Sequence, residues 1–155
     1  MALPDEPQLV EVPAFCVIGF QARTTNAAEA SGKGVIGPTI GKFKAHAAEI
    51  PGVADKSVTY AVYSGYESDF NGAYDYLMGN AAQAGATPPE GMKKIELPAA
   101  KYLVFPSAGV GAPEVIATWG RVWKYFSGSA KWQRAYTADF EKYTPDGMKI
   151  YIAVK

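Results

Sequence analysis

The sequence predicts an α+β protein made of two similar halves that share one mostly antiparallel sheet, with two helices on one face and a central pocket. Three observations lead to this fold class. Several runs are rich in β-forming residues, two segments have apolar residues at helical spacing, and the order of these elements repeats. Each half has the order strand, helix, strand, strand, at about residues 8–82 and 95–155. A chain of 155 residues is expected to form a single domain over residues 1–155.

The first half begins with FCVIGFQAR at residues 15–23, which predicts a strand because it is rich in β-forming residues. Apolar residues then recur every three or four positions between residues 36 and 50, which is the spacing of one helix face. Pro38 falls in the first turn of this helix, where its missing N–H costs little, and Pro51 follows the helix end.

Two strand-like runs, residues 57–68 and 72–80, follow and predict a hairpin. Asn71 and Gly72 lie between them and tolerate the positive φ angles that hairpin turns require. A proline-rich connection, TPPEGMKK, then separates the two halves rather than two domains.

The second half repeats this order. AKYLVF predicts a strand, residues 113–126 a helix, and TADFEKY and MKIYIAVK a hairpin around TPDG. The helix is predicted from residues at helical spacing: Ile116, Trp119, Trp123 and Phe126. YESDFNGAYDYLMG also aligns with FEKYTPDGMKIYIA, which indicates a weak internal repeat and matches Glu67 with Glu141. Two such units related by a pseudo-twofold axis would meet at a cleft, which is the natural ligand site.

Composition narrows the class of function. Fifteen basic and fifteen acidic residues give a net charge of zero, so neither nucleic acid nor an anionic membrane is an expected partner. The single cysteine, Cys16, removes the disulfide-rich secreted class. MALPDEPQLVEVP does not resemble a signal peptide and no window reaches the length of a membrane span, so we expect a cytoplasmic protein. The lone His46 has no second ligand or triad partner, and we expect no metal, cofactor or catalytic residue.

The last hairpin contains an acidic pair in an otherwise apolar and aromatic strand. A tight turn at residues 145–147 would place Glu141 opposite Tyr151. Alternation then puts the polar side chains on one face: Asp139, Glu141 and Tyr143. It puts the apolar side chains on the other face: Phe140, Ile150, Ile152 and Val154. Two interpretations fit: Glu141 lies in water beside Lys149, or it lies at the floor of a pocket walled by Tyr and Trp.

The second interpretation has a chemical consequence. An unpaired buried carboxylate costs several kcal/mol and has a raised pKa until a cation replaces its lost water. Aromatic faces would add roughly 0.5–2 kcal/mol for each good cation contact. This combination selects ligands that are both apolar and positively charged.

Five separated segments resemble the GyrI-like effector-binding domains, which occur at the C-terminus of AraC-type and MerR-type multidrug regulators and as stand-alone proteins. These segments are VPAFCVIGFQARTTN, YAVYSGYESDFNGAYDYLMG, PEGMKKIELPAAKYLVF, TWGRVWKYF and ADFEKYTPDGMKIYIAVK. They span nearly the whole chain in the family's order, and the chain is most similar to a stand-alone member of the sort carried on integron gene cassettes. No DNA-binding region is expected before Pro4 or after Val154.

The resemblance implies a doubled strand-helix-strand-strand fold with a central pocket for lipophilic cations such as dyes and quaternary or amidinium drugs. The pocket acid it implies is the Glu of the DFE motif, here Glu141. The aromatic wall it implies consists of Tyr63, Trp119, Trp123, Phe20 and Tyr151. Any action on transcription would then need a DNA-binding partner protein. Two alternatives stay open: hydrolysis of strained electrophilic antibiotics with Glu141 as acid or base, and inhibition of a topoisomerase by protein contact.

Some of these aromatic residues also have a purely structural interpretation. Trp119 and Trp123 at helical spacing are typical of core residues, and they can serve as core and wall together. We assign Tyr63 to the pocket and Tyr66 to packing between strands. Glu67, which begins an acidic loop, is expected to lie in solvent.

Overall fold

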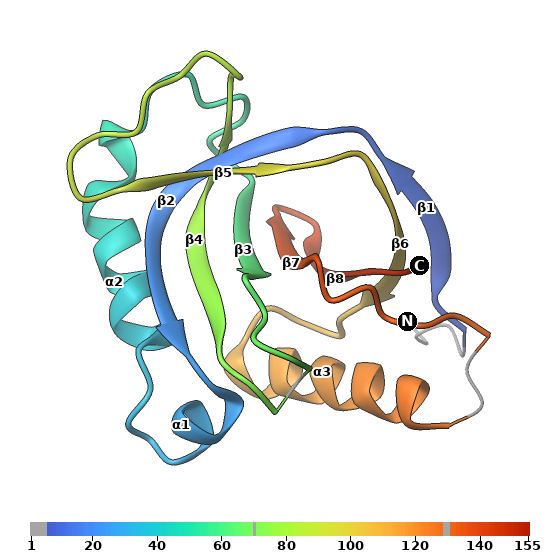
Figure 1. Cartoon of the computed structure of the whole chain (residues 1–155). Helices are drawn as coiled ribbons and strands as arrows, with labels where there is room; N and C mark the ends of the chain where they lie inside the picture. Colours follow the sequence, from blue (N-terminus) through green and yellow to red (C-terminus); the bar gives the residue numbers. More distant parts are fainter. Residues whose placement is uncertain (1–5, 70, 129–130) are drawn as a thin grey trace.

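A computed structural model describes residues 6–69, 71–128 and 131–155, and its architecture confirms the predicted α+β class (Figure 1). Within these residues, eight strands form one sheet in the order β1-β6-β8-β7-β3-β4-β2-β5, with antiparallel neighbours throughout. The strands are β1 (Gln8–Val12), β2 (Phe15–Thr24), β3 (Thr59–Ser64), β4 (Tyr74–Ala82), β5 (Lys93–Leu97), β6 (Ala100–Pro106), β7 (Ala138–Thr144) and β8 (Gly147–Ala153). The helices are α1 (Asn26–Ala30), α2 (Ile36–His46) and α3 (Ala112–Ser127), with a short 3-10 helix at Ala47–Glu49.

Both predicted helices and both predicted hairpins are present. Pro38 and Pro113 lie in the first turns of α2 and α3, where a missing N–H leaves no helical bond unmade. β3 pairs with β4 and β7 pairs with β8. The β3–β4 connection runs over residues 65–73 and is longer than a tight turn; Phe70 of the predicted turn lies outside the described residues. None of the described helices is long and apolar enough to cross a membrane.

Three elements, β1, β5 and α1, were not predicted from the sequence. β1 pairs with β6 and β5 pairs with β2, so each of these edge strands completes the sheet of the opposite half. Their sequences, QLVEV and KKIEL, are short and mix apolar with charged residues. Their stability therefore depends on partner strands that are distant in the chain, and local pattern gives little signal of it.

When the strands of the two halves are exchanged, the strand order is the same one read from the opposite edge of the sheet. β1 then corresponds to β5, β2 to β6, β3 to β7 and β4 to β8. The sequence contains a trace of this relation in VEVPA at residues 10–14 and IELPA at residues 95–99, which the sequence analysis did not use. A pseudo-twofold axis therefore passes between the two central strands, β3 and β7.

Glu141 lies beside this axis. The match of VEVPA with IELPA makes Phe20 equivalent to Phe105. Phe20 and Ala61 both pair with the same residue of β4, and Phe105 and Glu141 both pair with the same residue of β8. Ala61 is therefore equivalent to Glu141. Ala61 and Glu141 are also direct neighbours across β3 and β7. The predicted match between Glu67 and Glu141 is wrong, because Glu67 lies beyond β3 in an exposed loop.

The sheet curls, so that its two faces have different surroundings (Figure 1). α2 packs on β2 and β4 and α3 packs on β6 and β8, both on the outer face, which confirms the predicted placement of two helices on one face.

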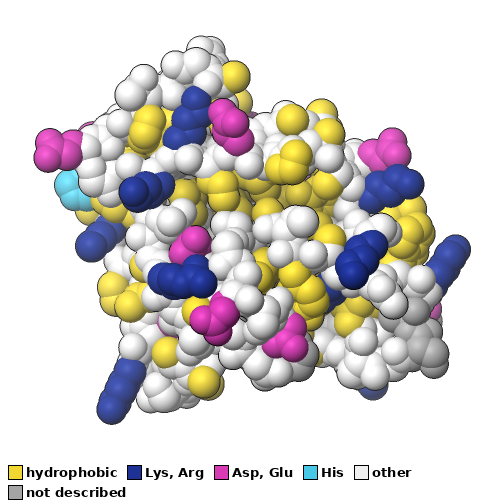
Figure 2. Space-filling model, in the orientation of Figure 1, with side chains coloured by type: hydrophobic (Ala, Val, Ile, Leu, Met, Phe, Trp, Pro, Cys, Tyr) yellow, Lys and Arg dark blue, Asp and Glu magenta, His cyan; other side chains and the backbone are white. Residues whose placement is uncertain are grey.

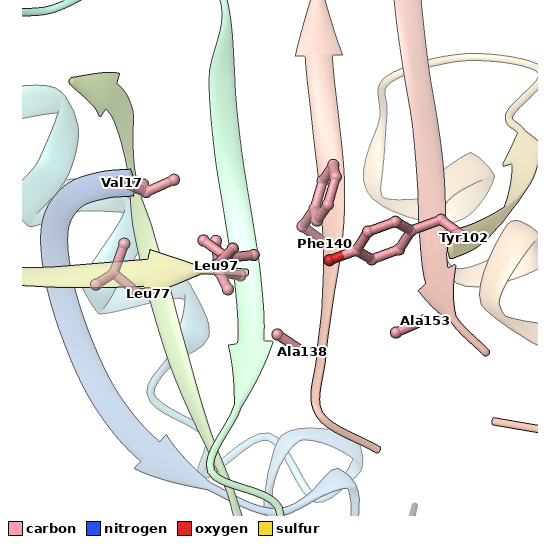
Figure 3. Close-up of a cluster of buried hydrophobic side chains, with 8 residues drawn as sticks. Val17, Leu77, Leu97, Tyr102, Ala138, Phe140 and Ala153 are labelled. Atoms are coloured by element: carbon pink, nitrogen blue, oxygen red, sulfur yellow. The ribbon is translucent and has the colours of Figure 1, made fainter. Parts of the chain in front are cut away.

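The inner face encloses a cluster of buried residues: Val17, Val62, Leu77, Leu97, Tyr102, Ala138, Phe140 and Ala153. The rings of Phe140 and Tyr102 meet there with centroids 5.2 Å apart (Figure 3). In the space-filling view, hydrophobic side chains appear across the middle of the molecule, and charged side chains occur both around its outline and beside this hydrophobic area (Figure 2).

The register of the last hairpin differs by one residue from the prediction. Thr144 pairs with Gly147, so the turn contains only residues 145–146. Glu141 therefore lies opposite Ile150 rather than Tyr151. A slip of one residue moves each side chain of the returning strand to the other face. Ile150 consequently shares the outer face with Glu141.

The predicted position of Tyr151 opposite Glu141 is therefore wrong. Tyr151 pairs with Phe140 and stacks on its ring on the inner face, with centroids 4.6 Å apart and planes 14° from parallel. The predicted shared face of Asp139, Glu141 and Tyr143 is confirmed.

Two glycines allow β2 and β4 to approach closely where β2 curves (Figure 1). Gly19 pairs with Gly79. A Cβ placed on Gly79 would lie 2.0 Å from the carbonyl oxygen of Ile18, which no side chain tolerates. The pair therefore permits a backbone contact that helps the sheet to curl.

We predict that Gly79→Ala lowers the free energy of unfolding by roughly 2–3 kcal/mol, because backbone atoms must move to make room for the methyl group. Urea denaturation measures this loss. Gly120→Ala is the matched control, since Gly120 is exposed on α3 and a Cβ there would meet nothing within 4 Å. It should raise the free energy of unfolding by roughly 0.5–1 kcal/mol. A loss of similar size in both variants would contradict the close-approach interpretation.

Candidate functional site

A cavity of about 440 Å³ lies on the outer face of the sheet. Its floor comes from β3, β4 and β7, and its walls come from α1, α2, α3 and the segments that precede α3 and β7. The two larger helices correspond to each other under the pseudo-twofold relation, so the cavity lies where the halves meet. Its volume is in the range of small-molecule sites.

Glu141 lies at the floor of this cavity and is 3% exposed. Tyr63 Oη and Trp119 Nε1 each donate to its Oε2 at 2.7 Å, and Tyr143 Oη donates to its Oε1 at 2.7 Å. In the part of the chain that the structure describes, no Lys, Arg or His forms an ion pair with Glu141. The carboxylate is thus held by three neutral donors and by no cation.

The surroundings of Glu141 change its acidity. Burial raises the pKa of the Glu141 carboxyl from 4.5, and the hydrogen bonds from Trp119, Tyr143 and Tyr63 oppose part of that rise. Burial and the nearby Glu141 charge also raise the pKa values of Tyr63 and Tyr143 well above 10. The two tyrosines therefore stay neutral at physiological pH, and they do not cancel the negative charge of the carboxylate.

Aromatic rings surround this acid. The Tyr63 ring lies with its centroid 5.4 Å from that of Tyr74, 5.3 Å from that of Tyr76 and 5.0 Å from that of Trp119. Trp123 follows one turn along α3, with its centroid 6.3 Å from that of Trp119. The cavity therefore offers several aromatic faces next to one negative charge.

α3 has two apolar faces with different roles. Thr118 and Val122 are its buried residues and pack toward the sheet. Ile116, Trp119 and Trp123, which were predicted from helical spacing, face the cavity instead. Ile116 is 67% exposed and Trp123 is 40% exposed, so they form an apolar wall that reaches the surface. Of the predicted stripe, Ile116 and Trp123 line the cavity, Trp119 lines the cavity and also packs on the core, and Phe126 packs on the core.

Arg134 also lines the cavity, and it is bound to a buried acid. Its Nη2 donates to Asp139 Oδ2 at 2.7 Å, and the two side chains are 5% and 0% exposed. Asp139 also accepts hydrogen bonds from Tyr66 Oη at 2.5 Å and from the backbone N–H of Ala153 at 2.7 Å. The guanidinium carbon lies 4.3 Å from the ring centroid of Tyr136. The charges of Arg134 and Asp139 therefore compensate each other.

Glu29 of α1 is a second acid in the cavity lining. Thr24 Oγ1 donates to its Oε2 at 2.5 Å, and the backbone N–H groups of Val35 and Ile36 donate to Oε2 and Oε1 at 2.9 Å and 3.2 Å. The last two groups lie at the start of α2, where unpaired N–H groups favour a carboxylate. Glu29 thus holds the N-terminus of α2 at the rim of the cavity.

The structure brings together most of the predicted site residues. Four of the six line the cavity: Tyr63, Trp119, Trp123 and Glu141. Phe20 does not line it: its side chain is on the outer face but lies under α2, with its ring centroid 5.8 Å from that of His46. Tyr151 does not line it either, because the hairpin register turns it to the inner face.

Other lining residues were missed or misassigned. Tyr66 lines the cavity, although the sequence analysis assigned it to packing. Tyr74 and Tyr76 line it from β4, and their alternation in GAYDYLMGN could have placed both beside Tyr63. Glu29 and Arg134 lie in segments without clear periodicity, and we find no sequence signal for them.

The remaining ionisable groups do not form a metal centre. No cluster of three or more His, Cys, Asp and Glu suited to a metal ion occurs among residues 6–69, 71–128 and 131–155. His46 is exposed and contacts Glu49 on the outside of the protein. The ionisable groups of the cavity lining other than tyrosine are the half-buried Glu29, the buried Glu141 and Arg134.

Comparisons with known proteins point to one family. The family model described as Cass2, integron-associated effector binding protein, matches residues 8–154. The crystal structure of the integron cassette protein VCH_CASS2, from the mobile metagenome of Vibrio cholerae, is 37% identical, with a TM-score of 0.81 over 97% of this chain and 96% of that chain. The structure of SAV2435 bound to tetraphenylphosphonium has a TM-score of 0.70 over 100% of this chain and 94% of that chain. At 17% identity, this second likeness shows the fold alone.

Two relatives are named as regulators of transcription. YobU of Bacillus subtilis (strain 168) is 34% identical over 110 residues, which cover 65% of this chain and 66% of YobU. BrlR of Pseudomonas aeruginosa is 29% identical over 136 residues, which cover 88% of this chain and 47% of BrlR. The chain thus spans less than two thirds of the length of either relative.

The buried pair of Arg134 and Asp139 gives a prediction about stability. Asp139→Asn should lower the free energy of unfolding by roughly 3–5 kcal/mol, because the buried guanidinium loses its counter-charge. Asp75→Asn is the matched control, since it breaks the pair with Arg23, in which the side chains are 48% and 28% exposed. We expect a loss of at most about 1 kcal/mol there. Comparable losses in urea denaturation would show that the buried pair has no special role.

Proposed function

This chain belongs to the Cass2 family of integron-associated effector-binding proteins, and we propose that its effectors are lipophilic cations, which bind in the cavity with Glu141 as counter-charge. One observation carries this proposal: Glu141 is 3% exposed inside an aromatic cavity and is held by neutral donors. A charge in that position has lost most of its hydration without gaining an ion pair. A positively charged guest restores the lost electrostatic stabilisation.

The hydrogen bonds to Glu141 leave room for such a guest. A carboxylate oxygen accepts about two hydrogen bonds. Oε2 accepts from Tyr63 and Trp119, whereas Oε1 accepts from Tyr143 alone. A ligand can therefore approach Oε1 without displacing a donor. A unit positive charge at ~4 Å gains about 4 kcal/mol at an effective dielectric constant of ~20.

The aromatic lining favours an apolar body on the same ligand. Faces of Tyr63, Tyr74, Trp119 and Trp123 border the cavity, and each good contact with a cation contributes roughly 0.5–2 kcal/mol. Apolar area buried against these rings and against Ile40 adds about 25 cal/mol per Å². A small hydrated cation gains little from this second term, so the cavity selects cations with large apolar substituents.

The comparisons support this class of ligand. SAV2435, which has the same fold, was solved with tetraphenylphosphonium, an organic cation with four aromatic substituents. The names of YobU and BrlR support a role in regulation, and we propose that ligand binding here is coupled to transcription through a DNA-binding protein. We place binding above hydrolysis because the family is one of effector-binding proteins.

We predict that Glu141→Gln weakens the binding of tetraphenylphosphonium by roughly 10- to 100-fold, because Gln keeps the shape of the side chain and removes its charge. Binding of neutral triphenylphosphine oxide should change by less than about threefold, since this molecule has no charge to lose. Isothermal titration calorimetry measures both affinities. Glu96→Gln, which removes an exposed charge from β5, should leave both unchanged. Equal losses for the cation and the neutral molecule would refute the counter-charge role.

Cation binding should also depend on pH. Burial raises the pKa of Glu141 from 4.5, and only the ionised carboxylate attracts a cation. As pH falls through this raised pKa, affinity for tetraphenylphosphonium should fall and then level off at a loss of roughly 10- to 100-fold, the loss expected for Glu141→Gln, because the protonated carboxyl is also neutral. Titrations from about pH 8 to about pH 4 test this, with Glu141→Gln as the control for other ionising groups. A wild-type profile as flat as that of the variant would place the Glu141 charge outside the binding equilibrium.

A further inference from the structure

The cavity contains a second carboxylate whose bonding resembles that of Glu141. Glu29 accepts from Thr24 and Val35 at Oε2 but from Ile36 alone at Oε1. Its three donors are neutral, and no ion pair of Glu29 occurs in the described residues. Like Glu141, it therefore has no cationic partner among the described residues, and its Oε1 has one acceptor position left.

The charge of the cavity lining supports a role for both acids. The lining contains Glu29, Glu141 and Arg134 as its ionised groups. Arg134 is paired with the buried Asp139, so its positive charge is already compensated. The lining tyrosines are neutral: burial raises the pKa of Tyr74 to about 12 and those of Tyr63, Tyr66, Tyr76 and Tyr143 above their ordinary value. Two negative charges thus remain without a positive partner.

Aromatic rings connect the two acids across the cavity. Tyr63 donates to Glu141, and its ring centroid lies 5.4 Å from that of Tyr74. Tyr74 Oη donates at 3.1 Å to Oδ1 of Asn26, which is in the same short helix as Glu29. Both acids line the cavity together with these two rings. An aromatic or aliphatic body that covers the rings can present a charged group at each end.

We propose that the cavity is a site for lipophilic dications, with one cationic group at Glu141 and the second at Glu29. This inference rests on the proposed function and adds the number and spacing of charges that the ligand carries. A monocation pairs with one carboxylate and leaves the other without a cationic partner. A dication of matching length satisfies both without additional displacement of hydrogen-bond donors.

The first test compares matched ligands on the wild-type protein. Bis(4-amidinophenoxy)alkanes with linkers of increasing length are measured beside analogues in which one amidine is replaced by a neutral group. We expect the dication to bind at least roughly tenfold more tightly than its monocationic analogue at one linker length, with a smaller ratio at shorter and longer linkers. A ratio near one at every length would overturn the inference. This test needs no variant and is unaffected by any effect of mutation on folding.

The second test assigns the extra affinity to Glu29. In Glu29→Gln the ratio of dication to monocation affinity should fall to about one at the best linker length, because the second charge has lost its counterpart. Circular dichroism checks that α2 is retained, since Glu29 also holds its N-terminus. Glu96→Gln, at an exposed position on β5, should keep the wild-type ratio. A ratio that survives in Glu29→Gln would overturn the assignment.

The two proposals fail in different ways. If Glu141 does not attract cations, Glu141→Gln leaves the affinity of the monocation unchanged, and the proposed function fails. If the monocation depends on Glu141 but the wild-type ratio stays near one, the site is monocationic and only the further inference fails.

Discussion

A carboxylate removed from water and held by neutral donors is the constraint on which the site depends. Glu141 takes this position where β3 and β7 are neighbours at the centre of the sheet, and the small, buried Ala61 lies opposite it. The pseudo-twofold relation that matches Ala61 with Glu141 also matches Tyr63 with Tyr143. The duplicated fold thus supplies two equivalent tyrosines to one acid, and both donate to it.

The two acids of β7, Asp139 and Glu141, differ in the partners that surround their carboxylates. Asp139 and Glu141 lie on the same face of the strand, and both are almost fully buried. Asp139 has Arg134 and a backbone N–H as partners, so its charge is compensated and it ties the 134–139 segment to β8. Glu141 has neutral donors, and burial raises its pKa. Loss of either partner in the first arrangement would leave a buried charge unpaired, whereas the raised pKa in the second lowers stability and leaves a charge for a ligand to compensate.

Local pattern predicted the parts of this site that depend on local structure. The prediction that Trp119 and Trp123 lie on one face depended only on the segment being a helix. The prediction that Asp139, Glu141 and Tyr143 share a face depended only on the segment being a strand. The position of Tyr151 depended on whether the TPDG turn has two or three residues, and one residue decides the face. The edge strands β1 and β5 and the lining residues Glu29 and Arg134 depend on contacts between distant segments. Periodicity does not report such contacts.

Under the proposed function, the unequal walls of the cavity would orient a ligand. α2 and α3 are equivalent in the fold, but α2 presents only aliphatic side chains such as Ile36 and Ile40 among its described lining residues, whereas α3 presents Trp119 and Trp123 beside its aliphatic residues. Trp119 also donates to Glu141, so the aromatic wall and the buried charge are joined on one side. A cation at Glu141 therefore lies against indole, where its attraction to the ring adds to the attraction to the carboxylate. The apolar remainder of such a ligand would extend toward α2, where Ile36 and Ile40 contribute apolar area and Glu29, at the start of the helix, contributes the second carboxylate. A fold that is symmetric in its backbone thus acquires a polar direction from a few side chains.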